Sequence, residues 1–144
     1  KPMKIDDAYS NENAFAKILR GELPAIKLYE DETTLAFMDI MPQIEGHCLV
    51  ICKEPATNLL TVSTQAAQEI IRVTQHLAGA VQKALDAPGI MIAQLNGSAA
   101  GQTIPHIHMH ILPRYNGIEL AFHAQEMADM SELERIAAKI RAEL

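Results

Sequence analysis

The sequence predicts an α+β fold in which helices pack against a five-stranded antiparallel sheet. Five short apolar stretches have the length or the alternation of strands, and they follow one another in an order typical of hairpins. One pattern with the period of a helix runs for over twenty residues, which is long enough to cover such a sheet. With 144 residues, 49% of them hydrophobic, the chain is expected to form one domain that folds without a metal or a disulfide.

Local signals support each element in turn. A short helix is expected at 13–20, where Asn13 is a suitable N-cap. The long helix begins after Ser63, and Ser131 starts a capping box for a final amphipathic helix. The five strands are predicted at 25–30, 33–40, 47–53, 90–95 and 106–112.

The charge and the hydropathy of the chain exclude several classes of partner. Twelve basic and eighteen acidic residues give a formal net charge of −6, and no cluster of basic residues is present, so we expect no binding to extended nucleic acid. A small phosphate-bearing ligand remains compatible with this charge, because a local group of backbone N–H donors can hold it. No apolar run has the length of a signal peptide or approaches the ~20 residues of a membrane span. We therefore expect a cytoplasmic protein that does not contact a membrane.

Three of the six histidines fall within one segment of five residues. His106, His108 and His110 alternate with Ile107 and Met109, which is the period of a strand that has one buried face. We therefore expect the three imidazoles to point the same way.

Three kinds of histidine site are compatible with this pattern. A histidine on an apolar face is usually a hydrogen-bonded structural residue, but three in a row are costly for a core to satisfy. Neutral imidazoles also bind zinc, yet residues four apart on a strand lie about 13 Å from each other, so the three cannot share one ion. Two of them together with His47 could do so. In the third kind, a neutral imidazole attacks phosphorus and forms a covalent phosphoryl or nucleotidyl intermediate.

The residues that precede the histidines favour the third kind of site. Attack on phosphorus requires donors for the non-bridging oxygens and a proton for the leaving group. Gly97 and Gly101 relax a loop whose backbone N–H groups can face a phosphate. Gln102 and Thr103 offer further donors at the edge of this loop. A loop of this kind that leads directly into the histidine strand indicates phosphate chemistry.

Two other polar residues lie at the ends of predicted strands. Asp39 continues the face formed by Leu35 and Phe37, and His47 opens the third strand. Asp39 could start a turn at the surface or serve the site. His47 could face water or lie near the histidines of another strand, and spacing alone leaves both questions open.

The segment from His106 to Leu112 resembles the signature of the histidine triad (HIT) family, in which histidines alternate with apolar residues. The resemblance extends over 13–114. The other similar segments, in the same order as in the family, are Ala14 to Pro24, Tyr29 to Asp31, Leu35 to Ile40, Pro42-Gln43, Gly46-His47, Leu49 to Ile51 and Ala100 to Thr103. The resemblance implies a single HIT domain over 1–144, with its core at 13–114 and a C-terminal loop and helix at 115–144.

The resemblance also implies an activity. The expected protomer has the HIT-like fold, usually forms a homodimer, and cleaves a nucleoside monophosphate such as AMP or GMP from an amine or a phosphate leaving group. His108 would attack the α-phosphorus and form a nucleotidyl-histidine intermediate that water hydrolyses. His106 and His110 would orient it and stabilise the phosphate, with His47 beside them. No cofactor or metal is required, although a polyphosphate substrate could bring a divalent cation.

The same resemblance assigns residues to the nucleotide. Asp39 would bind the ribose hydroxyls. The residues expected to line the base and ribose pocket are Phe15, Ile18, Phe37 and Ile40. The residues expected around the phosphate and the leaving group are Asn96, Gly101, Gln102 and Thr103.

The branch of the family is left open by the sequence. Segments up to residue 53 resemble nucleoside phosphoramidases, whereas Gly101 to Thr103 and Pro113-Arg114 resemble dinucleoside polyphosphate hydrolases. We therefore predict a hydrolase acting on P–N or phosphoanhydride bonds. The alternatives are a non-catalytic, regulatory module that binds purine nucleotides, and a nucleotidyl transferase. A nucleophilic histidine at the centre of the triad favours an enzyme.

Overall fold

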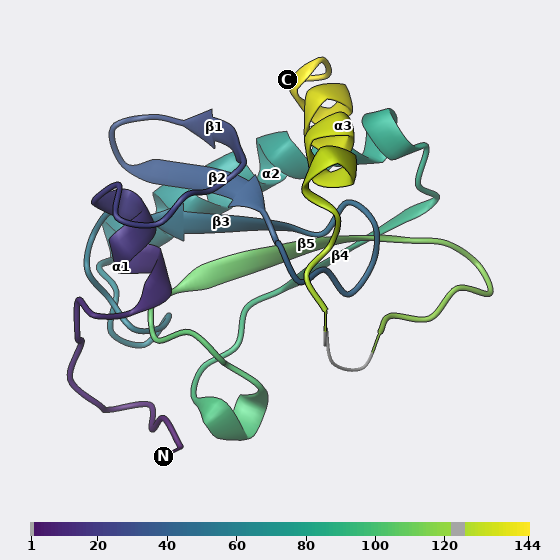
Figure 1. The fold of residues 1–144 in the computed structure, drawn as a ribbon. Coiled ribbons are helices and arrows are strands. Elements are labelled where there is room, and N and C mark those ends of the chain that lie inside the picture. The colour runs from purple at the N-terminus through teal and green to yellow at the C-terminus, as the bar shows by residue number, and fades with distance from the viewer. Residues whose placement is uncertain (1, 122–125) are drawn as a thin grey trace.

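The computed structural model describes residues 2–121 and 126–144, and within them five strands form one antiparallel sheet in the order β1-β2-β3-β5-β4 (Figure 1). The elements are α1 (Ala14–Leu19), β1 (Lys27–Glu30), β2 (Thr34–Met38), β3 (Cys48–Cys52), α2 (Thr64–Leu85), β4 (Gly89–Ala93), the 3₁₀ turn η1 (Ser98–Ala100), β5 (His108–Arg114) and α3 (Met130–Arg141). The predicted α+β class and the five-stranded sheet are confirmed. None of the helices in these ranges combines the length and the hydropathy needed to cross a membrane.

Two of the three helices begin where their caps were predicted. The Asn13 side chain accepts a hydrogen bond from the Ala16 N–H, and the Ser63 side chain accepts one from the Ala66 N–H. The predicted start of α3 is wrong by two residues, because Asp129 rather than Ser131 is its N-cap. The Asp129 carboxylate accepts from the Ser131 N–H at 2.8 Å, so the helical turn is already capped before Ser131.

The sheet has two faces of different composition, because alternate residues of each strand point to opposite sides. One side packs against α2 and α3, and we call it the α2 face. The other side packs against α1, and we call it the α1 face (Figure 1). The α2 face carries Ala36, Met38, Cys48, Val50, Cys52 and Ile111. The α1 face carries Leu35, Phe37, Leu49 and Ile51, packed around Phe15 of α1.

Strand β5 corrects the predicted histidine strand. It begins at His108 rather than at His106, and it continues to Arg114, where β4 still pairs with it through Gly89. His106 lies in a bend before the strand, and the next N–H, that of Ile107, donates to Ala56 O instead of to a neighbouring strand. The other predicted strand ends differ from the structure by at most two residues, and the end of β1 at Glu30 is as predicted. His123, expected to be an ordinary loop residue, lies outside the described residues.

Candidate active site

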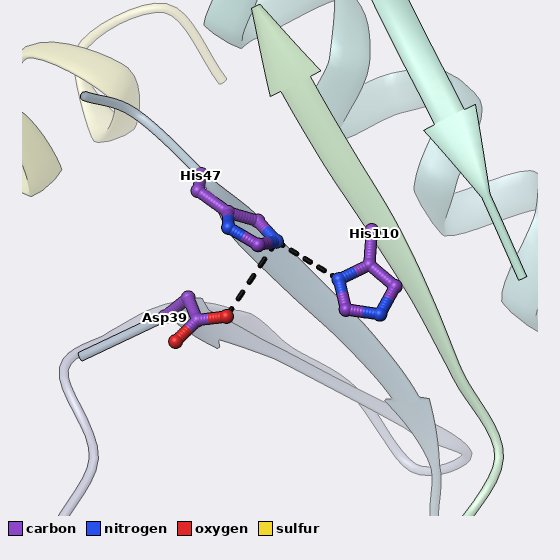
Figure 2. Close-up of side chains that lie close together, drawn as sticks. All are labelled: Asp39, His47 and His110. Atoms are coloured by element: carbon purple, nitrogen blue, oxygen red, sulfur yellow. Dashed lines mark hydrogen bonds and ion pairs between the residues drawn. The ribbon is translucent and has the colours of Figure 1, made fainter. Parts of the chain in front are cut away.

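The α1 face becomes polar where β2 and β3 end. Asp39 follows Phe37 by two residues and His47 precedes Leu49 by two, so both side chains continue the row of that face. The Asp39 N–H donates to His47 O at 3.0 Å, which extends the strand pairing by one step. His110 lies opposite Leu49 in the sheet, and its ring meets His47 (Figure 2). Of the two possibilities for Asp39 and His47, the structure therefore selects proximity to the histidines.

Hydrogen bonds determine which nitrogen of His47 and of His110 carries a proton. The Gln43 backbone N–H donates to His47 Nδ1 at 3.1 Å, so the hydrogen of a neutral His47 lies on Nε2. His47 Nε2 lies 2.9 Å from His110 Nδ1 and 3.5 Å from an Asp39 oxygen. His110 Nδ1 is therefore the acceptor, and the Nε2 of His110 bears a hydrogen that can be donated to a ligand.

His108 has the opposite tautomer. Its Nδ1 lies 2.7 Å from His106 O, which can only accept, so Nδ1 carries the hydrogen and Nε2 presents a lone pair. The Phe15 ring contacts the His108 ring edge-on, with centroids 4.9 Å apart and planes at 87°. The imidazole is thus held by a backbone acceptor on one side and by an aromatic ring on another, and its free nitrogen is the nucleophilic one.

His106 is completely buried and makes two hydrogen bonds, to Cys52 O at 2.8 Å and to the Tyr9 hydroxyl at 2.7 Å. His106 was expected on the histidine strand but precedes β5, and both of its ring nitrogens are used inside the protein, while its carbonyl accepts from His108. Sequence analysis missed Tyr9, which lies 97 residues before His106 and belongs to no motif.

Burial sets the charges of the site. Desolvation lowers the pKa of His47, His108 and His110 to about 4, with a smaller contribution from neighbouring histidines, and burial also lowers the pKa of His106. Desolvation raises the pKa of Asp39 to about 6, although the Met41 N–H donates to its carboxylate. At neutral pH the four histidines are neutral, and Asp39 is the anion of the site.

Three of the four predicted pocket residues meet beside His108. Phe15 and Phe37 form an edge-to-face pair with centroids 5.3 Å apart, and Ile18 packs against the same cluster. Ile40 does not join this cluster, and its side chain is 39% exposed next to Asp39. A partly exposed apolar side chain beside a carboxylate is compatible with the edge of a nucleoside pocket.

The loop before β5 is not an open cradle of backbone donors. Gly97, with φ of +86°, and Gly101, with φ of +99°, flank η1 in the left-handed region, which glycine tolerates. The backbone N–H groups of this loop that already donate within the protein are those of Gly97, Ser98, Ala100, Gly101 and Gln102. The expectation that these five groups face a phosphate is wrong, because the N-terminal segment and the loop itself use them.

The polar side chains of this loop differ in exposure. Gln102 is buried, with its oxygen on the Gly97 N–H at 2.7 Å and its amide on Thr57 O at 2.7 Å. Asn96 Oδ1 accepts from the Leu59 N–H at 2.9 Å. Gln102 and Asn96 thus shape the loop, whereas Thr103 and Gly101 are exposed and free to meet a ligand.

Asp39, His47 and His110 are the group among the described residues that could hold a metal ion. Each offers one ligand atom, and these atoms lie within 4.8 Å of one another. Four ligands at ~2.1 Å from zinc lie about 3.4 Å apart, whereas His47 Nε2 lies 2.9 Å from His110 Nδ1 and 3.5 Å from an Asp39 oxygen. An ion would have to replace the hydrogen between His47 and His110. Neither cysteine could help, because both are buried and burial raises the pKa of both thiols.

Comparison with known proteins places the chain in a family. Residues 20–117 match the model of the HIT domain. Adenosine 5'-monophosphoramidase of Schizosaccharomyces pombe is 37% identical over 102 residues, which cover 71% of this chain and 74% of the yeast protein.

Solved structures of HIT proteins superimpose on the fold. A Hit-like protein involved in cell-cycle regulation from Bartonella henselae is 47% identical, with a TM-score of 0.89 over 95% of this chain and 100% of that one. A zinc-bound histidine triad family protein from Mycobacterium smegmatis is 38% identical, with a TM-score of 0.79 over 90% of each chain.

Proposed function

The chain belongs to the histidine triad family, and we propose that within it this protein is a nucleotide hydrolase. It releases a purine nucleoside monophosphate, AMP or GMP, from an amine or a phosphate group through a covalent intermediate on His108. The names of yeast relatives, adenosine 5'-monophosphoramidase, support an amine as the leaving group.

The observation that carries the proposal is the lone pair on His108 Nε2. The bond from Nδ1 to His106 O excludes the other neutral tautomer while it is in place. The lowered pKa keeps the ring unprotonated well below neutral pH, so the nucleophile is available without a separate general base. A histidine retained only for structure would not need a nitrogen free of protein partners.

The reaction follows from these tautomers. His108 Nε2 forms a bond to the α-phosphorus as the bond from phosphorus to the substrate nitrogen breaks, and the amine leaves with that electron pair and takes up a proton from solvent. The ring, still protonated on Nδ1, becomes a nucleotidyl-imidazolium whose positive charge is stabilised by His106 O. Water then attacks phosphorus and gives up a proton to solvent, the bond from phosphorus to His108 Nε2 breaks, and the nucleoside monophosphate leaves. His110 Nε2–H donates to a non-bridging oxygen during both steps.

The nucleoside part binds where the polar row, formed by Asp39, His47 and His110, meets the apolar cluster around Phe15 and Phe37. Asp39 is ionised at neutral pH and accepts hydrogen bonds from the ribose hydroxyls. Phe15 and Phe37 present ring surface to the base, with Ile18 and Ile40 at its border. Thr103 and Gly101 border the phosphate from the loop. Asn96 and Gln102 act indirectly, by holding that loop.

The proposed chemistry uses no metal, since His108 supplies the nucleophile and His110 the donor. A divalent cation would enter only with a polyphosphate substrate. An ion bound by Asp39, His47 and His110 would take the ligand atoms that hold the His110 tautomer and bind the ribose.

The test is single-turnover hydrolysis of an adenosine phosphoramidate in the presence of a chelator, followed by mass spectrometry of the quenched protein. Wild type should show a burst and an added nucleotidyl mass. His108→Ala should lose both, with turnover reduced at least ~10³-fold. His76→Ala is the matched control, because that histidine is exposed on α2, and it should behave as wild type.

A diadenosine polyphosphate measured in parallel decides between the two leaving groups. If wild type binds AMP but shows neither a burst nor turnover on either substrate, with and without added metal, the hydrolase proposal fails. A nucleotide-binding module would then explain the pocket.

We also propose that the protein is a homodimer in which two sheets join. Strand β4 is at the edge of the sheet and pairs only with β5 within the described residues. Ile92 on this strand is 41% exposed, and Ile71 on α2 is 50% exposed. An edge strand that carries apolar side chains favours pairing with a second chain. Light scattering should give twice the mass of the chain, and Ile92→Lys should shift it towards the monomer.

A further inference from the structure

The two partners of His106 fix the position of its proton. Cys52 O can only accept, so the His106 Nε2 that lies 2.8 Å from it carries the hydrogen. Nδ1 then presents its lone pair to the Tyr9 hydroxyl, 2.7 Å away, which must donate. The buried ring is therefore held from both sides as the neutral Nε2–H tautomer, and the hydroxyl of Tyr9 is half of that arrangement.

Tyr9 reaches His106 from an N-terminal strap, residues 3–10, that runs beside the glycine loop (Figure 1). Met3 exchanges two hydrogen bonds with Ser98 of η1, at 2.7 and 2.9 Å. Asn58 donates to Ile5 O at 2.9 Å, and the strap then leads into the cap of α1. Tyr9 is thus tethered on both sides, which reduces the conformational entropy lost in placing its hydroxyl.

The hydrogen bond between Tyr9 and His106 also affects the orientation of the nucleophile, His108. The carbonyl that accepts from His108 Nδ1 is that of His106, the residue whose ring Tyr9 holds. His106 lies in a bend outside the sheet, and its peptide is held on the N–H side by the bond from the Ile107 N–H to Ala56 O at 2.9 Å. The ring contacts, including the edge-on contact with Tyr9 at a centroid distance of 5.6 Å, hold the His106 side of this peptide.

We infer that Tyr9 is a positioning residue for the hydrolysis, which holds His106 as the Nε2–H tautomer and thereby holds the carbonyl that orients His108. Its kinetic consequence rests on the proposed function, whereas its effect on the tautomers does not. Without the hydroxyl, His106 Nδ1 is a buried acceptor with no donor, a situation that proteins avoid. The ring would then rotate towards another donor, and the bond to Cys52 O that fixes its tautomer would be lost.

The experiment compares Tyr9→Phe with Tyr115→Phe, a control that removes the same atom from a hydrogen bond of 2.9 Å to Leu85 O. Two-bond ¹H–¹⁵N spectra of histidine-labelled protein at pH 7 report each tautomer. Wild type and Tyr115→Phe should show His106 protonated on Nε2 and His108 protonated on Nδ1. In Tyr9→Phe the His106 Nδ1 signal should move towards the value averaged between tautomers, and the His108 Nδ1–H signal should broaden or shift.

Kinetics supply the second readout. Tyr9→Phe should lower kcat about tenfold and leave KM within about twofold, because the Tyr9 hydroxyl bonds to His106 and is not assigned a contact with the nucleotide. Tyr115→Phe should change neither constant. The inference is overturned if both tautomers persist in Tyr9→Phe, whether or not kcat falls. If wild type hydrolyses neither substrate, the proposed function fails, and the spectra still decide whether Tyr9 sets the tautomers.

Discussion

The α2 face and the α1 face of the sheet are made from alternate residues of the same strands, but they differ in what they bury. On the α2 face the buried strand residues are apolar, cysteines whose thiols stay protonated, or Thr34, whose hydroxyl donates to the Asp31 carboxylate. The α1 face is apolar over Leu35, Phe37, Leu49 and Ile51 and then continues into Asp39, His47 and His110. One strand register supports both parts, because packing of the α2 face stabilises the sheet that aligns Asp39, His47 and His110.

The largest expected effects come from two substitutions in β5, one on each face of the sheet. Ile111 is completely buried on the α2 face. Ile111→Ala should lower the free energy of unfolding by about 2–5 kcal/mol, because it leaves a cavity. Turnover per folded molecule should stay within about twofold, since the side chain points away from the site. Urea unfolding and titration of active sites measure the two quantities.

His108→Ala is the reciprocal variant, from the α1 face of the same strand. It should lose turnover, and because its buried ring packs on Phe15, it should also lower the free energy of unfolding, by roughly 1–3 kcal/mol. If Ile111→Ala also abolished turnover in the folded fraction, the two faces would not be separable in this way.

Acidification should destabilise the protein through the α1 face. Between pH 6.5 and about 4 the unfolded chain protonates its histidines, whereas the folded chain, in which the pKa of His47, His108 and His110 is about 4, does not. The unfolded state then binds more protons, so the free energy of unfolding falls as the pH drops, by roughly 2–4 kcal/mol between pH 7 and 5. Urea unfolding over this range measures the change.

Asp39 gives this prediction an internal control. Because the pKa of its folded form is raised to about 6, protonation between pH 6 and 4 favours the folded state and opposes the histidines. In Asp39→Asn this opposing contribution is absent, so the loss of stability on acidification should be steeper than in wild type. A shallower dependence would mean that Asp39 does not titrate in this range.

The polar row should also separate binding from chemistry. Asp39→Asn should raise KM about tenfold for a ribonucleotide substrate, because the amide replaces a charged acceptor, and leave kcat within about threefold. A 2'-deoxy substrate should be affected less, since it lacks one of the hydroxyls assigned to Asp39. Equal losses on the two substrates would contradict the assigned role.

The smallest expected effect concerns the turn that delivers His47. Gly46 has φ of +94°, and a Cβ there would meet the Leu85 side chain. Gly46→Ala should lower the free energy of unfolding by roughly 1–2 kcal/mol. Gly21 has φ of +79° with open space around it, so Gly21→Ala isolates the backbone cost. In thermal unfolding, the Tm of Gly46→Ala should be lower than the Tm of Gly21→Ala.

Local signals in the chain were sufficient for the architecture and for much of the site. The caps Asn13 and Ser63 and the period-two alternation of the strands depend on residues a few positions apart, so they can be recognised without a structure. The same alternation placed Asp39 in line with Phe37. The start of α3 was missed because Ser131 carried a capping pattern of its own, and Asp129 had already capped the turn.

The tautomers of the site histidines are decided only by the tertiary structure. His106 depends on Cys52, 54 residues away, and on Tyr9, 97 residues away, and His47 meets His110 across 63 residues. The loop looked like a phosphate cradle from its glycines, but Met3 and Gln102 take its donors once the chain is folded. Periodicity tells which side of a strand a residue occupies, because that follows from the backbone alone. Which nitrogen of a histidine is free follows from partners that only folding brings within 3 Å.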